Sequence, residues 1–400
     1  MRSGGQAVRL AHLTTADISL RFLLRDQLRA FRNEGFDVIA MSAPGPWTVD
    51  LERDGVQHVP VPALERRWAP GADLRAFAAL VAALRRWRPT IVHTHTPKAR
   101  ILGRLAARLA GVPIVVNTFH GLYGVEGAPL RRRLFLWLER FGARWSDFEF
   151  CQSREDLATL HQARVVSPGR SAFLGNGVNL TWFDPDRVNV RVVREELQIR
   201  PGTVVVGMVG RLVWEKGYHE FFAMAKALKK EDPDLVVLVV GPHEPGKRDA
   251  VPQDVIDDLN RRGVVRFLGM RTDMPAVLAA LDVFVLPSYR EGFPRAAVEA
   301  AAMRLPLVIT DIRGCREVVT EGVNGYLVPT RDVERLVDRV RRLVRDRDLR
   351  ARLGHESRRR ALAEFDERRV ITTTLSVYRR LLMEKMGVTV VAYQESTAVR

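Results

Sequence analysis

Cysteine is almost absent from this chain, which contains only Cys151 and Cys315 among its 400 residues. Neither belongs to a Cys-x-x-Cys pair or a Cys/His cluster, so the sequence offers no disulfide framework and no zinc-binding motif. Long apolar runs are also absent, since none approaches the roughly 18–20 residues that span a bilayer. The segment 1–13 lacks the apolar core and cleavage site of a signal peptide. We therefore expect a cytoplasmic protein.

Acidic residues are scarce relative to basic ones, because 47 Asp and Glu oppose 63 Lys and Arg and leave a formal net charge of +16. This excess indicates an anionic partner, which could be nucleic acid, acidic lipid head groups or a phosphorylated substrate. The greater part of the excess lies within residues 1–178. Hydrophobic residues make up 46% and charged residues 28% of the chain, a balance typical of a globular enzyme. The length predicts two domains.

Short apolar runs alternate with amphipathic helical patterns in both halves of the chain. The runs are rich in β-branched residues and nearly continuous in hydrophobicity, which is typical of parallel strands covered by helices on both faces. They lie at 8–13, 36–41, 90–94, 113–119, 203–210, 235–241, 264–269, 283–287, 306–310 and 325–329. We predict two doubly wound α/β domains over 1–178 and 179–366, with a C-terminal helix and tail over 367–400 that returns to the first domain. One Arg-rich helix is expected over 333–353.

Two loops that follow predicted strands of the second half carry charged side chains. GRLVWEKG (210–217) places Arg211 and Lys216 at a strand end and just before a helix. Cations beside a helix N-terminus form an anion site, although isolated surface charges are more often only solvated. REGFPRAAVE (290–299) leaves another strand, and Pro294 suits the first position of the next helix.

The second of these loops holds two carboxylates, Glu291 before the helix and Glu299 more than a turn inside it. We interpret them as acceptors for the hydroxyls of an extended ligand rather than as an acid and base pair. Together with the two cations they fit a nucleotide sugar, which has phosphates and diols. Taken alone, a residue such as Glu299 is more often an ordinary exposed helix residue.

These motifs carry a resemblance to a known family. GRLVWEKG, EGFPRAAVE and DIRGCREVVTEGVNGYLVP (311–329) look like the signature loops of family 4 of the retaining glycosyltransferases. PTIVHTHTPKARILGRLAARLAGVPIVVNTFHG (89–121) is similar to members that build bacterial polysaccharides and glycans on polyprenyl-diphosphate carriers. The resemblance implies the GT-B fold, in which two Rossmann-like domains face each other across a cleft.

The resemblance also assigns residues. It places Arg211 and Lys216 at the donor diphosphate, Glu291 against the transferred sugar and Glu299 at the ribose. His120, at the end of the NTFHG strand, would lie near the sugar. The candidate catalytic residues are therefore His120, Arg211, Lys216 and Glu291. The remaining donor-binding candidates are Gly210, Phe267, Leu268, Gly269, Met270, Gly292, Phe293, Pro294 and Glu299.

The first predicted strand departs from the family pattern, because it runs into TTADISLRF without a glycine-rich loop. Thr14, Thr15 and Asp17 could replace that loop by side-chain hydrogen bonds, although Asp17 is better suited to cap a helix. Lys98 and Arg100 in HTHTPKAR are candidate contacts for the diphosphate of a lipid carrier. The acceptor candidates are thus Thr14, Asp17, Lys98 and Arg100.

Leaving-group charge determines the expected mechanism. Cleavage of the anomeric C–O bond builds negative charge on a nucleoside diphosphate, and fixed protein donors must meet it. We expect Arg211, Lys216 and a helix N-terminus to do so, with no metal and no cofactor. The resemblance implies retention of the anomeric configuration, and since no nucleophile is evident on the other face of the sugar, attack on the face of the departing group is favoured over a covalent intermediate.

The positive charge of the first half of the chain indicates the kind of acceptor and the cellular location that we expect. PLRRRLFLWLERFGARW (129–145) could lie on an anionic bilayer, or its apolar stripe could pack on the sheet and leave the arginines in water. Our hypothesis is a peripheral enzyme on the inner face of the plasma membrane that uses a UDP-sugar and a polyprenyl-diphosphate-linked saccharide. The alternatives are a soluble acceptor and a non-hydrolysing UDP-sugar epimerase. Nucleic acid is not expected as a partner, because no binding module is recognisable.

Overall fold

The computed structural model describes residues 8–64, 69–126 and 128–389. The chain divides into two compact units: unit 1 contains Met1–Leu174 and Val370–Arg400, and unit 2 contains Gly175–Arg369. Each unit is built on one parallel β-sheet. The chain therefore leaves unit 1, forms the whole of unit 2 and then returns.

Unit 1 has a seven-stranded sheet in the order β3-β2-β1-β4-β5-β6-β7. Residues in the central strands are buried on both faces, as their near-continuous hydrophobicity predicts. The strands are β1 Arg9–Ala16, β2 Asp37–Ala43, β3 Gln57–Pro60, β4 Ile91–Thr94, β5 Ile114–Phe119, β6 Phe148–Cys151 and β7 Ser171–Phe173.

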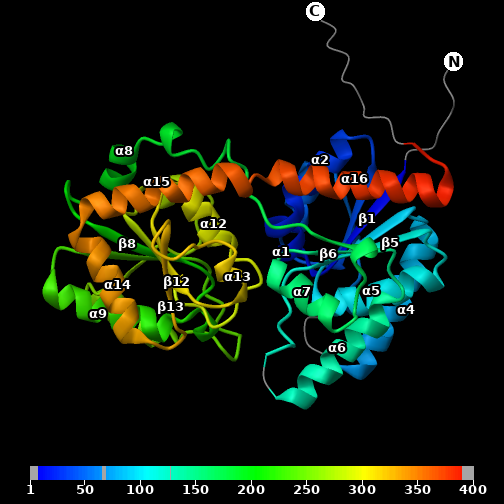
Figure 1. Ribbon diagram of the computed structural model, residues 1–400, viewed down its shortest axis with the longest axis horizontal. Helices are drawn as coiled ribbons and strands as arrows, with labels where there is room; N and C mark the ends of the chain where they lie inside the picture. Colours follow the sequence, from blue (N-terminus) through cyan, green and yellow to red (C-terminus); the bar gives the residue numbers. More distant parts are fainter. Residues whose placement is uncertain (1–7, 65–68, 127, 390–400) are drawn as a thin grey trace, which may run out of the picture. The chain divides into compact units, whose positions relative to one another are not determined.

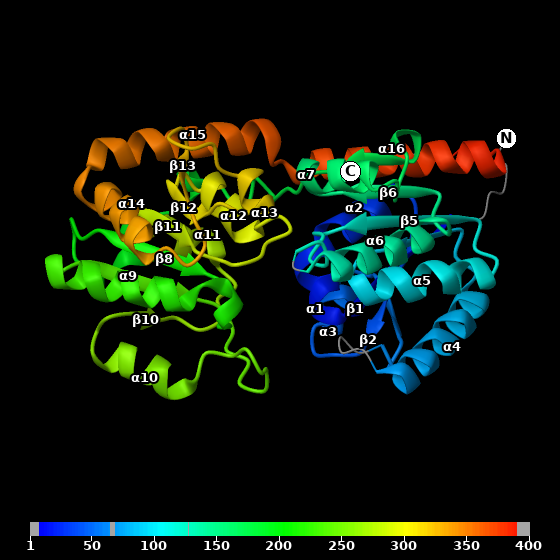
Figure 2. The same cartoon turned by 60° about the horizontal axis from the view of Figure 1, so that its bottom comes forward.

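Helices cover both faces of this sheet (Figures 1 and 2). One face packs against α2 and α16 through a core that includes Phe31, Tyr378 and Leu382. The other packs against α4 and α5 through a core that includes Leu80 and Ala106. The helices are α1 Asp17–Ser19, η1 Leu20–Leu24, α2 Arg25–Asn33, α3 Thr48–Arg53, α4 Pro70–Trp87, α5 Pro97–Leu109, α6 Pro129–Ala143, α7 Arg154–Gln162, η2 Pro168–Arg170 and α16 Glu367–Met386.

Unit 2 has a six-stranded sheet in the order β10-β9-β8-β11-β12-β13. Its strands are β8 Val205–Val209, β9 Val236–Val240, β10 Arg266–Phe267, β11 Val283–Leu286, β12 Leu307–Thr310 and β13 Gly325–Val328. In Figure 2, α9 and α14 lie on one side of this sheet, and α12 and α15 on the other. The helices are η3 Pro185–Arg187, α8 Val190–Glu196, η4 Trp214–Lys216, α9 Tyr218–Glu231, α10 Gln253–Arg261, α11 Met274–Ala279, α12 Arg295–Ala302, α13 Arg313–Arg316, α14 Val333–Arg345 and α15 Arg347–Glu364.

The predicted fold class is confirmed, since both sheets are parallel and doubly wound. Two local predictions are wrong. The single helix expected over 333–353 is two helices, because Asp346 ends α14 and its side chain accepts from the amide of Leu349 to begin α15. Pro294 lies one residue before the first turn of α12, as its N-cap, rather than inside that turn.

Candidate active site

The strand order of unit 2 marks one place for a ligand. β8 and β11 are neighbours in the sheet, yet their connections run to opposite sides, so the loops that follow them diverge at the carboxyl edge. Such a switch point is where doubly wound sheets bind ligands. The loop after β8 carries Arg211 and Lys216, and the loop after β11 carries Glu291.

At this switch point Lys216 and Glu291 form an ion pair. Lys216 Nζ lies 2.6 Å from Glu291 Oε1, and the side chains are only 21% and 10% exposed. Ser288 Oγ donates to the same carboxylate oxygen at 2.8 Å. The hydroxyl of Thr310, at the end of β12, donates to the carbonyl of Ser288 at 2.5 Å. Three strand ends therefore hold one carboxylate in place.

Arg211 is also paired with a carboxylate. Its Nη1 lies 3.4 Å from Glu244 Oε2, and Lys247 pairs with the same oxygen. Partial burial would raise the pKa of Glu244, but the hydrogen bond and charge of Lys247 and the charge of Arg211 outweigh it, so the pKa is lowered. Both cations predicted to meet a phosphate are thus compensated in this conformation. The sequence did not predict these partners.

Close backbone contacts join the loops of this edge. Gly217 has a left-handed φ of 81°, and a Cβ there would overlap the carbonyl oxygen of Pro287. A Cβ on Gly241, after β9, would overlap the carbonyl oxygen of Gly210. One on Gly314, after β12, would overlap the carbonyl oxygen of Gly292. Only glycine allows these loops to touch backbone to backbone.

Glu299 lies on α12, partly buried and 13% exposed. Arg295, one turn earlier, donates from Nε to its Oε1 at 3.0 Å. Burial raises the pKa of Glu299, and the charge and hydrogen bond of Arg295 only partly oppose this. The carboxylate is poised to accept further hydrogen bonds, because a single guanidinium contact leaves lone pairs unused.

The remaining predicted donor residues lie on loops at the same sheet edge. Gly210 accepts from the Tyr218 hydroxyl at 3.0 Å through its carbonyl. Gly269 has a left-handed φ of 64° and accepts the Gly241 amide at 2.8 Å. Of the side chains, Phe293 is buried and Met270 is exposed. Four predicted donor residues remain. Phe267 is the last residue of β10 and Leu268 follows it, and Gly292 and Pro294 lie in the loop before α12.

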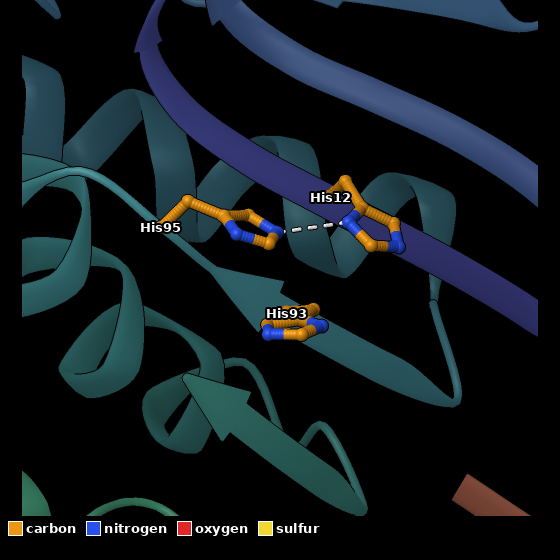
Figure 3. A group of neighbouring side chains, drawn as sticks. All are labelled: His12, His93 and His95. Atoms are coloured by element: carbon orange, nitrogen blue, oxygen red, sulfur yellow. Dashed lines mark hydrogen bonds between the residues drawn. The ribbon is translucent and has the colours of Figure 1, made fainter. Parts of the chain in front are cut away.

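Unit 1 contains an array of four histidines at its own switch point, between β1 and β4. Figure 3 shows His12 on β1 and His95 just after β4 joined by a hydrogen bond, with His93 beside them. His12 Nδ1 lies 2.9 Å from His95 Nε2, and His95 Nδ1 lies 3.1 Å from His120 Nε2. His120 Nδ1 lies 3.1 Å from Gln152 Oε1.

This array is ordered and neutral. Because Gln152 Oε1 accepts, His120 and His95 each donate from Nδ1 and accept at Nε2. His12 donates from Nδ1 to His95, and its Nε2 is buried without a partner in the described residues. Burial lowers the pKa of His12 to about 3 and that of His120 to about 4. It also lowers the pKa of His93 and His95 well below the usual value.

The hydrogen bonds of the histidine array determine which ring nitrogens are available to a metal ion or a ligand. His12, His93 and His95 bring ligand atoms within 4.8 Å of one another. However, one ring nitrogen of His93 is hydrogen-bonded to the Tyr378 hydroxyl, and the other lies 2.7 Å from Thr118 Oγ1. The His93 ring also stacks on that of His95, with 4.2 Å between the ring centroids. Rings stacked in this way do not point their lone pairs at one centre. Both ring nitrogens of His120 are engaged as well.

The predicted acceptor cations are buried. Lys98 is 3% exposed and pairs with Asp73, and Arg100 is 1% exposed and pairs with Glu139 at 2.5 Å. Arg100 also lies over the ring of Phe119. These cations stabilise the packing of α5 and are not available to a carrier diphosphate in this conformation. The sequence did not indicate this burial, because the partners lie on α4 and α6, 25 and 39 residues away along the chain.

The polar residues at the end of β1 are also engaged within unit 1. Thr14 is fully buried and donates to the carbonyl of Ala16 at 2.9 Å. Asp17 accepts from the amides of Ile18 and Trp47, both at 2.8 Å. It therefore joins the β1 and β2 loops, whereas the sequence favoured a helix cap.

Sequence reasoning missed several residues of the unit 2 site. Ser288 and Glu244 were not predicted, although Ser288 directly follows a buried strand and the strand-end rule could have found it. Tyr289 was missed too; it donates to both carboxylate oxygens of Glu220 at 2.9 Å. Burial and Glu220 raise the pKa of Tyr289 to about 12.

Both halves of the chain match known protein families. Residues 23–177 match the glycosyl transferase 4-like domain, and residues 189–360 match glycosyl transferases group 1. The Escherichia coli UDP-Gal:alpha-D-GlcNAc-diphosphoundecaprenol alpha-1,3-galactosyltransferase is 33% identical over 87% of this chain and 91% of that protein. The Campylobacter jejuni N,N'-diacetylbacillosaminyl-diphospho-undecaprenol alpha-1,3-N-acetylgalactosaminyltransferase is 26% identical over 94% of this chain and 99% of that protein.

A solved structure supports the fold. The Anabaena protein HepE in complex with UDP superposes with a TM-score of 0.76 at 22% identity, over 93% of this chain and 99% of that one. Two doubly wound units and these matches define a glycosyltransferase of the GT-B fold. The chain belongs to family 4 of these enzymes. Among its described helices, none has the length and apolar character needed to cross a bilayer.

Proposed function

We propose that this chain is a retaining glycosyltransferase that moves a sugar from a UDP-sugar to a saccharide linked to a polyprenyl diphosphate. The observation that carries the proposal is the Lys216–Glu291 pair at the switch point of unit 2. A cation and a carboxylate held together there suit a ligand with phosphates and hydroxyls. The names of the two relatives above, with undecaprenol-linked acceptors and, in one, UDP-Gal as donor, support the substrates.

Donor binding must rearrange the existing ion pairs. A diphosphate competes with Glu291 for Lys216 and with Glu244 for Arg211. When Lys216 turns to the phosphate, the Glu291 carboxylate keeps its bond from Ser288 and becomes free to accept hydroxyls of the sugar. The donor itself would thereby complete the site.

The transfer step follows from the charges. The anomeric C–O bond breaks, and Lys216 and Arg211 stabilise the growing charge on the leaving diphosphate. The acceptor oxygen bonds to the anomeric carbon on the same face, and its proton passes to the leaving phosphate oxygen. With the charge met by residues of the chain, we propose that the reaction needs no divalent metal.

The proposal also assigns His120 and the place of action. His120 would lie near the sugar, where its ring could contact a ligand only after leaving His95 or Gln152. Because the proposed acceptor is anchored in lipid, the enzyme would work peripherally at the inner face of the plasma membrane, where nucleotide sugars are available.

A single assay tests the reaction, its donor, its stereochemistry and its independence of metal. The protein is incubated with UDP-galactose, UDP-glucose or their N-acetylated forms and a short polyprenyl-diphosphate-linked N-acetylglucosamine, with and without EDTA. We expect one donor to give a disaccharide by mass spectrometry, with an α-linkage by NMR and unchanged yield in EDTA. A β-linked product would contradict retention. Interconversion of UDP-sugars without acceptor would indicate an epimerase, and loss of activity in EDTA with rescue by Mg²⁺ would contradict metal independence.

A further inference from the structure

The loop between β9 and α10 places a carboxylate beside a cation that is predicted to meet the donor diphosphate. Glu244 Oε2 lies 3.4 Å from Arg211 Nη1, and Lys247 pairs with the same oxygen. The side chains of Arg211, Glu244 and Lys247 are 39%, 30% and 31% exposed, so a ligand can reach them. A carboxylate next to a phosphate site repels the ligand. The position of Glu244 therefore needs an explanation other than ligand binding.

The segment that carries Glu244 is hydrogen-bonded to the loop after β8 on both sides of this residue. The amide of Leu212 donates to the carbonyl of Pro242 at 3.1 Å. The amide of Trp214 donates to the carbonyl of Asp249 at 2.9 Å. Because backbone contacts hold the segment in place, Glu244 stays beside the site when the Arg211 side chain turns to a ligand.

Each carboxylate of this site has a second donor that remains when its cation leaves. Glu244 keeps Lys247, and Glu291 keeps the hydroxyl of Ser288 at 2.8 Å. A diphosphate can thus take Arg211 and Lys216 without leaving either carboxylate unpaired, which would be costly in a partly buried site. The same arrangement allows the reverse exchange, in which the original ion pairs form again.

Release of the product is the step at which the reverse exchange matters. A free nucleoside diphosphate carries more negative charge than the same diphosphate esterified to a sugar. Uncompensated cations would therefore hold the product more tightly than the donor. Product release limits the turnover of many enzymes, so a carboxylate that competes with the product for its cation favours turnover.

We infer that Glu244 is a resident counter-ion of Arg211, which the donor diphosphate displaces and which pairs with Arg211 again when the nucleoside diphosphate leaves. Glu244 thereby lowers the affinity for the product and speeds its release, and Lys247 is a positioning residue that holds Glu244 during the exchange. The inference rests on the proposed function, because it takes the diphosphate of a nucleotide sugar as the ligand.

Binding measurements on Glu244→Gln test the inference. The probes are UDP and inorganic pyrophosphate, titrated by calorimetry at constant ionic strength, and uridine, followed by ligand-observed NMR. The matched control is Glu231→Gln. Glu231 is the last residue of α9, is 35% exposed and, like Glu244, pairs with two cations, Arg341 and Arg345. The control removes the same charge from unit 2 at a position outside the loops of the site.

We expect Glu244→Gln to bind UDP and pyrophosphate about tenfold more tightly than wild type, because the ligand no longer has to displace a charge. Dissociation of UDP, measured by stopped flow, should slow by a similar factor, since changes within one site mostly alter koff. Uridine, which has no phosphate, should bind both proteins equally. The control should behave like wild type with all three ligands.

Four results would overturn the inference. Unchanged affinity and dissociation in Glu244→Gln would show that Glu244 does not compete with the ligand. Equal tightening in Glu231→Gln would mean that net charge alone explains the effect. Equal tightening for uridine would place the effect on the nucleoside. Absence of binding of both UDP and pyrophosphate to wild type would leave no diphosphate for Glu244 to compete with.

A double-mutant cycle tests the role of Lys247. Lys247→Gln should weaken UDP binding, because Glu244 then loses its second partner when Arg211 turns away. The same substitution should have no effect in the Glu244→Gln background, since Lys247 is inferred to act through Glu244. Equal weakening in both backgrounds would make Lys247 a direct phosphate ligand and overturn its positioning role.

These measurements separate the inference from the proposed function, because they need neither a sugar nor an acceptor. Tighter diphosphate binding by Glu244→Gln supports the inference even if wild type transfers no sugar, a result that would contradict the proposed function alone. Sugar transfer by wild type with unchanged diphosphate binding in Glu244→Gln would support the proposed function and overturn the inference.

Discussion

At the residue scale, Lys216 has two roles. In the structure it fixes the Glu291 carboxylate, and in the proposed reaction it meets the charge of the departing diphosphate. Because Lys216 is proposed to contact the diphosphate as its charge grows, its loss should raise the free energy of the transition state more than that of the ground state. Glu299, in contrast, is proposed to hold the ribose, whose contacts do not change during transfer.

For Lys216→Ala we expect kcat/KM to fall about a hundredfold, since loss of one charge-assisted donor to a transition-state oxyanion costs on the order of 3 kcal/mol. The matched control is Lys230→Ala, at the exposed end of α9, which should behave like wild type. Steady-state assays of both variants make the comparison. Similar activity in the two variants would remove Lys216 from the mechanism.

For Glu299→Ala we expect KM for the donor to rise while kcat changes little, because uniform binding affects KM alone. The direct measurement is the affinity for UDP by calorimetry, which should weaken in parallel. A variant that binds UDP normally but turns over slowly would place Glu299 at the reacting centre instead.

The sequence predicted single residues well only where the signal was local. Lys216 and Glu291 follow buried strands and Glu299 lies in the helix after one, so their positions beyond these strands could be predicted. The burial of Lys98 and Arg100 could not, because it depends on Asp73 and Glu139 from helices that reach them only in the folded unit. A cation at a strand end is a site candidate until its distant partner is known.

At the scale of elements, the loops of unit 2 depend on glycines. Gly217 combines a left-handed φ with contact to the backbone of Pro287. Gly202 has the same φ of 81° but nothing within 4 Å of its Cβ position. A comparison of alanine substitutions at the two positions therefore separates the cost of the left-handed backbone from the cost of steric overlap.

We expect Gly202→Ala to lower the free energy of unfolding by about 1 kcal/mol, the usual cost of a left-handed alanine. Gly217→Ala should cost more than about 2 kcal/mol, because the β8 and β11 loops must also separate. Urea unfolding of both variants measures the difference. Equal losses would show that the contact between the loops contributes nothing.

The elements themselves were predictable to the extent that their hydrophobic pattern was strong. The central strands of both sheets were found, whereas β3 (QHVP), β6 (FEFC) and β7 (SAF) were not, because a polar residue begins or interrupts each of these short apolar runs. The break between α14 and α15 was missed because a capping aspartate in an Arg-rich stretch resembles an ordinary salt-bridging residue.

At the scale of the whole molecule, the three buried histidines of the array and the partly buried His120 all belong to unit 1. Their folded pKa values lie below the usual 6.5, so the unfolded chain takes up protons first as the pH falls. Their contribution to stability is complete above pH 6.5 and is lost as the pH falls, down to about 4 for His120 and about 3 for His12. Each histidine adds a slope of at most about 1.4 kcal/mol per pH unit.

We therefore expect the urea midpoint of unit 1 to fall markedly between pH 7.5 and pH 5, and that of unit 2 to change less. Pulsed hydrogen exchange at one labelling pH, resolved by peptide, reports each unit separately. Replacing His12 by Phe, which removes the ring whose Nε2 lacks a partner, should flatten the dependence in unit 1. A steeper response in unit 2 would contradict this expectation.

The return of the chain to unit 1 through α16 has a consequence for synthesis on the ribosome. Strands β1 to β7 emerge first, yet Leu375, Tyr378 and Leu382 of their core are translated only after all of unit 2. Unit 2 is contiguous and can complete its core while unit 1 still waits for its last helix. A nascent chain that stops before residue 370 would hence release a finished second unit joined to a first unit with an open apolar face. Quality control by chaperones is needed most for the half that was made first.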